Sequence, residues 1–256
     1  MSTFLRFFLP ATYFQASRLN RLSLVGYNGL VEWLPAIFLS VYFNPHGLGI
    51  IPTVLISYGA FICIYEIGYI TNDFYSERYE TDPRGRKSLL SDDIKPVAAL
   101  IVLRIGFFLL FTYAAGALTS VLWWVFHASL MATFILHNSL PSNLRIPTFF
   151  ALSTYRFFGP VILSLSGGVI VLLLPAILLN NSLYRVTVYI RNKTEKKLGS
   201  PAVGFKFAFY AGCLPLSVML SALQDSVMPV VVCLYFVLVW ILYWLGAKLV
   251  PSVAKV

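Results

Sequence analysis

The side chains best suited to chemistry are concentrated in one short stretch of the chain. Asn72 is followed by four carboxylates within ten residues, Asp73, Glu77, Glu80 and Asp82. The first three acids are spaced four and three residues apart, so they share one face if a helix continues through them. Like charges on one face repel, and a divalent cation relieves that repulsion. Because hard oxygen ligands suit Mg2+, which joins carboxylates to substrate phosphates, the four acids form a predicted magnesium site.

The composition indicates which elements must position these residues. Of 256 residues, 59% are hydrophobic and 11% charged, and the mean hydropathy is +0.80, which is too apolar for a soluble domain. A membrane core takes about 20 residues of helix. Apolar runs of that length lie at 23–43, 50–71, 96–115, 117–137, 148–166, 168–184, 203–222 and 227–249. The sequence therefore predicts an all-α, polytopic transmembrane bundle of about eight helices. It forms a single domain, residues 1–256, with its N-terminal segment along the membrane interface.

Lysine and arginine are distributed unequally between the two sides that these runs define. All 19 except Arg104 and Arg156 fall in the N-terminal segment, in connections after even-numbered helices or in the C-terminal region. Cytoplasmic connections are enriched in these residues, so we expect an integral protein of the plasma (inner) membrane with both termini in the cytoplasm. The net charge of +9 then reflects topology and contact with anionic lipid, and nucleic acid is not an expected partner.

Four charged side chains and one histidine lie deep inside the apolar runs. An unpaired Arg104 or Arg156 within the membrane would cost at least about 2.5 kcal/mol, so each needs a partner. Glu32 and Glu66 are the available counter-ions, and His127 is a possible neutral partner. All five lie roughly 9 to 15 Å from the cytoplasmic ends of their helices. The shared depth predicts one polar cavity that opens to the cytoplasm, and buried ion pairs that only fix helix packing are the alternative.

The acidic stretch resembles a family motif. Asn72-Asp73 at the end of the second run, the acids that follow and the basic cluster before the third run are similar to the first aspartate-rich motif, N-D-x-x-D-x-x-x-D, of the UbiA superfamily of intramembrane prenyltransferases. Here Ser76 stands at the second aspartate and Glu80 at the third. The resemblance implies a bundle of typically nine helices, one more than predicted. It also implies that the motif holds Mg2+ against the diphosphate of a polyprenyl donor, and that loops 72–95 and 185–203 cap the active site.

The resemblance also indicates which basic residues bind phosphate. The family's second acidic motif, D-x-x-x-D, follows helix six, but here that segment has one acid, Glu195, among several bases. Because Arg and Lys bind phosphate strongly, we expect this segment to bind it without metal. The candidate phosphate-binding residues are Arg84, Arg86, Lys87, Arg145, Arg185, Arg191, Lys193 and Lys197. The candidate catalytic residues are Asn72, Asp73, Glu77 and Glu80, and the candidate cavity residues are Glu32, Glu66, Tyr69, Arg104, His127 and Arg156.

Three functions remain open. The first is Mg2+-assisted departure of diphosphate from a polyprenyl donor, with transfer of the prenyl group to a second small-molecule or lipid acceptor. The second is transfer of phosphoribose from phosphoribosyl diphosphate to a polyprenyl phosphate, as in one branch of the superfamily. The third is a non-enzymatic transporter, for which the acids would be a solvated face balanced by nearby bases. In the enzyme readings Asp73 is expected at an exposed helix end, and aromatic faces such as Tyr69 stabilise an allylic cation.

Overall fold

The computed structural model describes residues 3–19, 22–75, 89–90, 93–141, 144–194 and 203–249. Every regular element within these ranges is helical, so the predicted all-α class is confirmed. The N-terminal part contains α1 (Thr3–Arg6), α2 (Thr12–Arg18), α3 (Leu22–Asn28), the π-helix η1 (Gly29–Trp33), α4 (Leu34–Phe43) and η2 (Gly47–Ile50). The middle contains α5 (Ile51–Tyr75), α6 (Ile94–Ala114), α7 (Val121–Ser139), α8 (Ile146–Phe158) and η6 (Gly159–Val161). The last part contains α9 (Gly167–Ile177), the π-helix η7 (Leu178–Ser182), α10 (Leu183–Thr194), α11 (Val203–Gln224) and α12 (Met228–Leu249).

Several helices in the described part of the chain suit a membrane. Five stretches are long and apolar enough to cross one, namely Gly47–Tyr75, Ile94–Ala114, Val121–Ser139, Gly167–Arg191 and Phe205–Gln224. Large apolar side chains on α6 and α7, such as Val102, Leu110 and Val125, are exposed on the outside of the bundle. Continuous apolar exposure of this kind is unfavourable in water and favourable in lipid. The fold is therefore that of an integral membrane protein.

Local sequence signals set several helix boundaries. The side chains of Asp93, Ser120 and Ser166 accept hydrogen bonds from backbone N–H groups at the starts of α6, α7 and α9. Such caps satisfy donors that the first helical turn leaves free. Gly116 has a φ of +63° just after α6, a conformation that glycine adopts without steric cost. These residues explain why the apolar runs break where they do.

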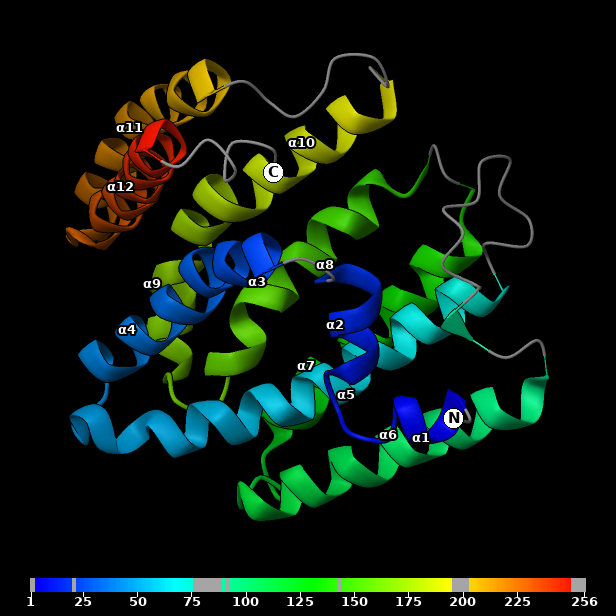
Figure 1. Cartoon of the computed structure of the whole chain (residues 1–256). Coiled ribbons are helices and arrows are strands. Elements are labelled where there is room, and N and C mark those ends of the chain that lie inside the picture. The colour runs from blue at the N-terminus through cyan, green and yellow to red at the C-terminus, as the bar shows by residue number, and fades with distance from the viewer. Residues whose placement is uncertain are drawn as a thin grey trace.

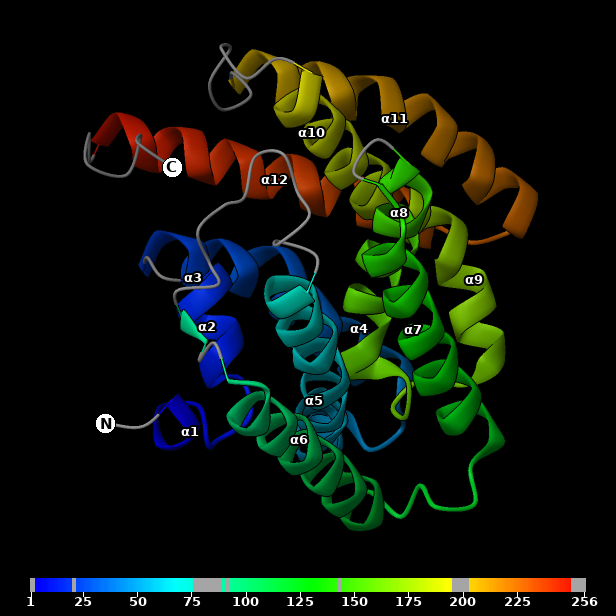
Figure 2. The ribbon, with the colours of Figure 1, turned by 90° about the vertical axis from the view of Figure 1, so that its right-hand side faces the viewer.

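α5 occupies the centre of the bundle. It packs along α6, and it also contacts α2 on one side and α7 on another. Figures 1 and 2 show this central position, with α11 and α12 paired at one edge. The C-terminal ends of α5, α7 and α10 lie toward the right or upper right of Figure 1, whereas those of α4 and α6 lie toward the lower left and that of α11 lies at the left edge. The alternation matches consecutive crossings of a membrane.

Two crossings differ from the sequence prediction. The sixth continues as a helix through α10, so the first part of the predicted loop 185–203 is helical. The fifth is short because α8 ends at Phe158, next to Gly159-Pro160, and proline disfavours helix at the residue before it. The side chains of Arg185 and Arg191 are consequently held on a helix that extends from the membrane crossing.

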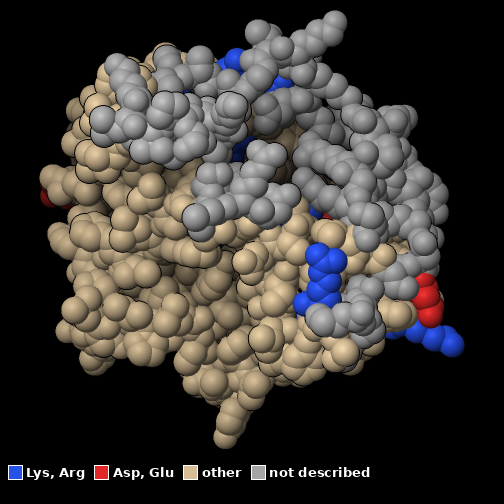
Figure 3. Space-filling view, in the orientation of Figure 1, with Lys and Arg blue, Asp and Glu red and all other residues tan. Residues whose placement is uncertain are grey.

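The surface reflects the same division between lipid and water. In Figure 3 the coloured Lys, Arg, Asp and Glu atoms are few, and most of them lie on the upper and right-hand sides. The lower left of this face is almost entirely tan. This is the side on which α4 and α6 end in Figure 1.

We predict that His46 and Leu144 lie on opposite sides of the membrane. A cysteine at His46 should react with a membrane-impermeant maleimide in intact cells, and one at Leu144 only after permeabilisation. The background should be low because Cys63, Cys213 and Cys233 are buried. Labelling of both positions from the same side would contradict the predicted number of crossings.

Candidate functional site

A buried ion pair between α5 and α6 organises the polar interior. Arg104 Nε lies 2.6 Å from Glu66 Oε2, and both side chains are fully buried. Arg104 also donates to three successive carbonyl oxygens, those of Phe7 (2.7 Å), Phe8 (2.9 Å) and Leu9 (3.0 Å). A buried charge is tolerated when it is paired and its other N–H groups are hydrogen-bonded. The pair meets both conditions and fastens the N-terminal segment to the bundle.

Glu66 also holds the beginning of α2. Its carboxylate accepts hydrogen bonds from the backbone N–H of Ala11 (3.1 Å) and of Phe14 (2.6 Å). The first turn of a helix otherwise leaves such donors without a partner, and a negative charge there suits the helix dipole. Ala11 adopts a left-handed φ of 71°, which costs a residue with a Cβ about 1–2 kcal/mol. The bond to Glu66 helps to offset this strain and fixes where α2 starts.

α2 brings two side chains to Asp73, in the last turn of α5. Arg18 donates from Nη2 to Oδ1 (2.8 Å) and from Nη1 to Oδ2 (3.0 Å), and the Tyr13 hydroxyl donates to Oδ2 (2.8 Å). Asp73 is only 2% exposed, so the expected exposed helix end is wrong, because α2 covers it. Burial lowers the pKa of Arg18, but its hydrogen bond and charge interaction with Asp73 outweigh burial and raise the pKa above its ordinary value. Arg18 therefore stays positively charged while it is paired with Asp73.

Asn72 contributes an acceptor that the described residues leave unused. Its Nδ2 donates to Asp73 Oδ1 (3.1 Å), whereas its Oδ1 is buried and accepts no hydrogen bond from a described residue. An unused amide oxygen beside a carboxylate fits a ligand for a hard cation. Within the described ranges no three His, Cys, Asp or Glu side chains gather as a metal site. Glu77, Glu80 and Asp82 lie outside these ranges, so Asp73, with Asn72 beside it, is the described member of the predicted magnesium site.

A second set of charges joins α8 to the first and sixth crossings. Glu32 accepts from Arg156 Nε (2.7 Å) and from Arg185 Nη2, so one carboxylate serves two guanidinium groups. Arg156 also donates to Asn28 Oδ1, and Arg185 Nε donates to Asn181 Oδ1 (3.4 Å). Relative exposures are 4% for the Glu32 side chain, 13% for Arg156 and 14% for Arg185. We call these five residues the Glu32 group.

The first and sixth crossings, which carry Glu32 and Asn181, both leave α-helical geometry at this point. Glu32 lies in η1 and Asn181 in η7, each a π-helix of five residues. Pro35 follows η1, and Pro175 precedes η7. A proline removes a backbone N–H and disturbs the hydrogen-bond ladder, which a wider turn can accommodate. π-Helical turns are rare in proteins, and those that occur often lie at functional sites. The Glu32 group is therefore a candidate site.

Aromatic rings connect Asp73 with the Glu32 group. The guanidinium carbon of Arg18 lies 4.2 Å from the ring centroid of Tyr69, and that of Arg156 lies 4.9 Å from Phe14 and 5.9 Å from Tyr65. Tyr69 stacks on Phe14 and meets Tyr65 edge-on, with centroids 5.8 and 5.0 Å apart. Cations are attracted to such ring faces. The interior therefore offers guanidinium groups for anions and ring faces for cationic or apolar carbon.

The five ionisable residues predicted to share one cavity are divided between separate contacts. Glu66 pairs with Arg104, and Glu32 pairs with Arg156. The prediction that His127 is a neutral partner of Arg104 or Arg156 is wrong, because His127 contacts neither arginine. Its Nδ1 lies 2.9 Å from the carbonyl oxygen of Trp123, in its own helix, and its ring packs among aromatic side chains.

The remaining predicted phosphate-binding residues are spread over the chain. Arg145 is buried and donates from Nε to the carbonyl oxygen of Leu140 (2.8 Å), and the Arg191 guanidinium lies over the Phe205 ring. Lys193 is part of α10. Arg84, Arg86, Lys87 and Lys197 lie outside the described residues.

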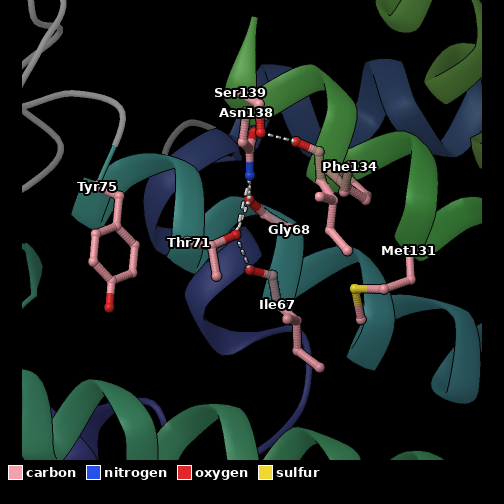
Figure 4. A pocket seen from close by; sticks show the side chains of 9 residues that line it. Ile67, Gly68, Thr71, Tyr75, Met131, Phe134, Asn138 and Ser139 are labelled. Atoms are coloured by element: carbon pink, nitrogen blue, oxygen red, sulfur yellow. Dashed lines mark hydrogen bonds between the residues drawn. The ribbon is translucent and has the colours of Figure 1, made fainter.

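A groove on the outside of the bundle follows the same end of α5. It has a volume of about 260 Å3 and lies between α5 and α7. Its lining residues are Ile67, Gly68, Thr71, Tyr75, Met131, Phe134, Ile135, Asn138 and Ser139. Figure 4 shows the Asn138 amide pointing to the Gly68 carbonyl oxygen and the Thr71 hydroxyl, each 3.0 Å away. A Cβ on Gly68 would lie 2.3 Å from the Phe134 ring, so glycine permits this approach of the two helices.

Sequence reasoning missed several residues of the interior. Arg18 was counted only as a topology signal, and Tyr13 and Asn28 carried no recognisable pattern. Asn181 had a usable signal, since two successive asparagines interrupt the apolar sixth run. Amide side chains within a membrane crossing usually face the bundle interior.

The fold and the buried charges define a class of protein, a polytopic α-helical membrane protein with a cationic, aromatic interior. No family model matches the chain, and no curated protein or solved structure matches it either.

We predict that Glu66→Gln lowers the free energy of unfolding by about 3–5 kcal/mol, because it leaves Arg104 buried without a counter-charge. Hydrogen exchange at residues 7–18 should rise with it, since Glu66 and Arg104 together hold that segment. Thermal unfolding in detergent and exchange mass spectrometry measure the two effects. Arg6→Gln, at the exposed end of α1, should change neither. Unchanged exchange in α2 of Glu66→Gln would contradict the anchoring role.

Proposed function

We propose that the chain is an intramembrane transferase of the UbiA type. Its substrate is a polyprenyl phosphate or diphosphate, and Mg2+ assists the departure of diphosphate while the prenyl group passes to an acceptor. We further propose that it works in the plasma (inner) membrane with both termini in the cytoplasm.

The observation that carries this proposal is the position of Asn72 and Asp73. They lie at the end of the central helix α5 within an apolar bundle, and Asp73 pairs with Arg18, whose guanidinium group lies over the Tyr69 ring. The unused Asn72 Oδ1 suits a magnesium ligand. The adjacent Asp73 carboxylate would join it once Arg18, which now pairs with both of its oxygens, is displaced. Bound there, Mg2+ would supply positive charge to a leaving diphosphate.

The chain's own residues would have three tasks. Arg156 and Arg185 would bind phosphate oxygens and stabilise the charge that develops on them. Tyr65 and Tyr69 would present ring faces to the carbon from which the diphosphate departs, where positive charge develops. The bond from that carbon to the diphosphate breaks with its electron pair on oxygen, the acceptor forms the new bond, and the acceptor releases a proton. The apolar bundle would limit the access of water.

A second candidate is transfer of phosphoribose from phosphoribosyl diphosphate to a polyprenyl phosphate. It is favoured by the excess of basic residues at the sixth crossing, where the family's second acidic motif would hold metal. In this case Asp73 would serve the diphosphate and the Glu32 group the lipid phosphate. A transporter is the remaining alternative.

Arg18 allows the metal role of Asp73 to be tested without turnover. Arg18→Gln frees the Asp73 carboxylate, so Mg2+ should stabilise this variant against heat. The double variant Arg18→Gln/Asp73→Asn has the same overall charge balance as the native pair but no carboxylate, and Mg2+ should leave its melting temperature unchanged. Equal responses of the two variants to Mg2+ would exclude Asp73 as a metal ligand.

Turnover tests the function itself. The purified protein should release diphosphate in a Mg2+-dependent manner, either from a polyprenyl diphosphate or from phosphoribosyl diphosphate with a polyprenyl phosphate. The substrate that reacts selects between the two enzymes. The double variant should be about 100- to 1,000-fold slower, the scale on which loss of one electrostatic stabiliser lowers turnover. Turnover with neither substrate set would favour a transporter.

A further inference from the structure

The three buried carboxylates described above differ in the number of arginines with which they pair. Asp73 and Glu66 each pair with one arginine. Glu32 is shared by Arg156 and Arg185, so this group has one more cation than it has anions. An uncompensated charge that is largely removed from water is costly in a membrane protein. The excess therefore needs an explanation that a packing role does not provide.

The same group holds hydrogen-bond donors that no described residue uses. Arg156 and Arg185 each donate from Nε and Nη2, but Nη1 of each makes no hydrogen bond to a described residue. Asn181 is 2% exposed, and its Nδ2 is buried with no acceptor among the described residues. Of these three donors Asn181 Nδ2 is the buried one, and buried donors are almost always satisfied in folded proteins. Arg104 shows the contrast, because Glu66 and three backbone carbonyls occupy its guanidinium group.

We propose that Arg156, Arg185 and Asn181 form an anion site that binds a phosphate group without a metal ion. Glu32 positions both guanidinium groups, and its single charge leaves the pair one positive charge in excess. Unused donors from three side chains suit a tetrahedral group with several acceptor oxygens, and arginine is the residue that best matches phosphate geometry. The two π-helices η1 and η7 contribute Glu32 and Asn181, and both of these side chains contact Arg185.

The proposal deepens the proposed function and rests on it only for the identity of the substrate. The phosphate could belong to a polyprenyl phosphate or to a free phosphate compound. These sources share the phosphate group and differ in the lipid chain. Inorganic phosphate, inorganic diphosphate and a micellar polyprenyl phosphate therefore serve as separate probes.

The test is anion binding to the purified protein in EDTA, followed by the shift in thermal unfolding at constant ionic strength. The expected order of affinity depends on the source: the lipid probe should bind most tightly if the site takes a lipid phosphate, and inorganic diphosphate if it takes a free one. Arg185→Gln should weaken binding about 10- to 150-fold, the effect of one charge-assisted hydrogen bond. Asn181→Leu removes only the buried amide and should also weaken binding.

Glu32→Gln separates a binding role from a structural one. Loss of the carboxylate lowers the stability of the free protein but increases the excess positive charge, so it should enlarge the anion-induced thermal shift. A purely structural ion pair would give lower stability with no larger shift. Arg6→Gln removes an exposed charge of the same type and should leave anion binding unchanged.

The proposed anion site would be refuted if Arg185→Gln and Asn181→Leu both bound the anion with the affinity of the native protein. It would also be refuted if the anion effect required Mg2+. Anion binding in EDTA without any turnover would support the site and count against the transferase. Turnover together with Arg185-independent binding would support the transferase and refute the site. The two proposals can therefore fail separately.

Discussion

The polar interior depends on the ion pair between Glu66 and Arg104. In a bundle surrounded by lipid, neither charge can be buried alone, and each uses its remaining hydrogen-bonding capacity on the N-terminal segment. That segment contains α2, which in turn places Tyr13 and Arg18 on Asp73. A pair that could have served helix packing alone therefore determines the environment of the one aspartate at the end of α5.

Charge and aromatic surface then extend across the bundle. Arg18 faces Tyr69, Tyr69 stacks on Phe14, and Phe14 lies beside Arg156, which shares Glu32 with Arg185. Cation–π contacts contribute more when they are removed from water, which is the case for these mostly buried groups. The interior is thus electropositive, held in place by three carboxylates, and bordered by ring faces. These are the features on which the proposed substrate, with an anionic head and an unsaturated, apolar body, is based.

Much of this fold could be predicted from the sequence, because hydrophobic length and the placement of basic residues are strong signals. The helical class and most crossing boundaries followed from apolar runs alone. The end of α8 at Gly159-Pro160 and the extension of α10 did not, since they depend on local proline geometry and on a helix that continues beyond its apolar part. The π-helices could not be predicted from the sequence either, because they depend on packing as much as on local sequence.

The site was less predictable than the fold. Glu32 and Glu66 were identifiable as partners of buried arginines because few anions were available at that depth. The contacts of Asp73 could not be foreseen, since Arg18 is 55 residues away in the chain and looks like an ordinary cytoplasmic charge. Asn181 acquires its role only when η7 turns it toward Arg185. Long-range polar contacts of this kind have no periodicity for a sequence pattern to reveal.

The central claim is that this cationic, aromatic interior binds a phosphate-bearing polyprenyl lipid. Mass spectrometry of the lipids that copurify with the protein from its native membrane tests it most directly. We predict enrichment of a polyprenyl phosphate or diphosphate over the surrounding membrane. Copurification of bulk phospholipids alone, in the proportions of the membrane, would contradict the claim.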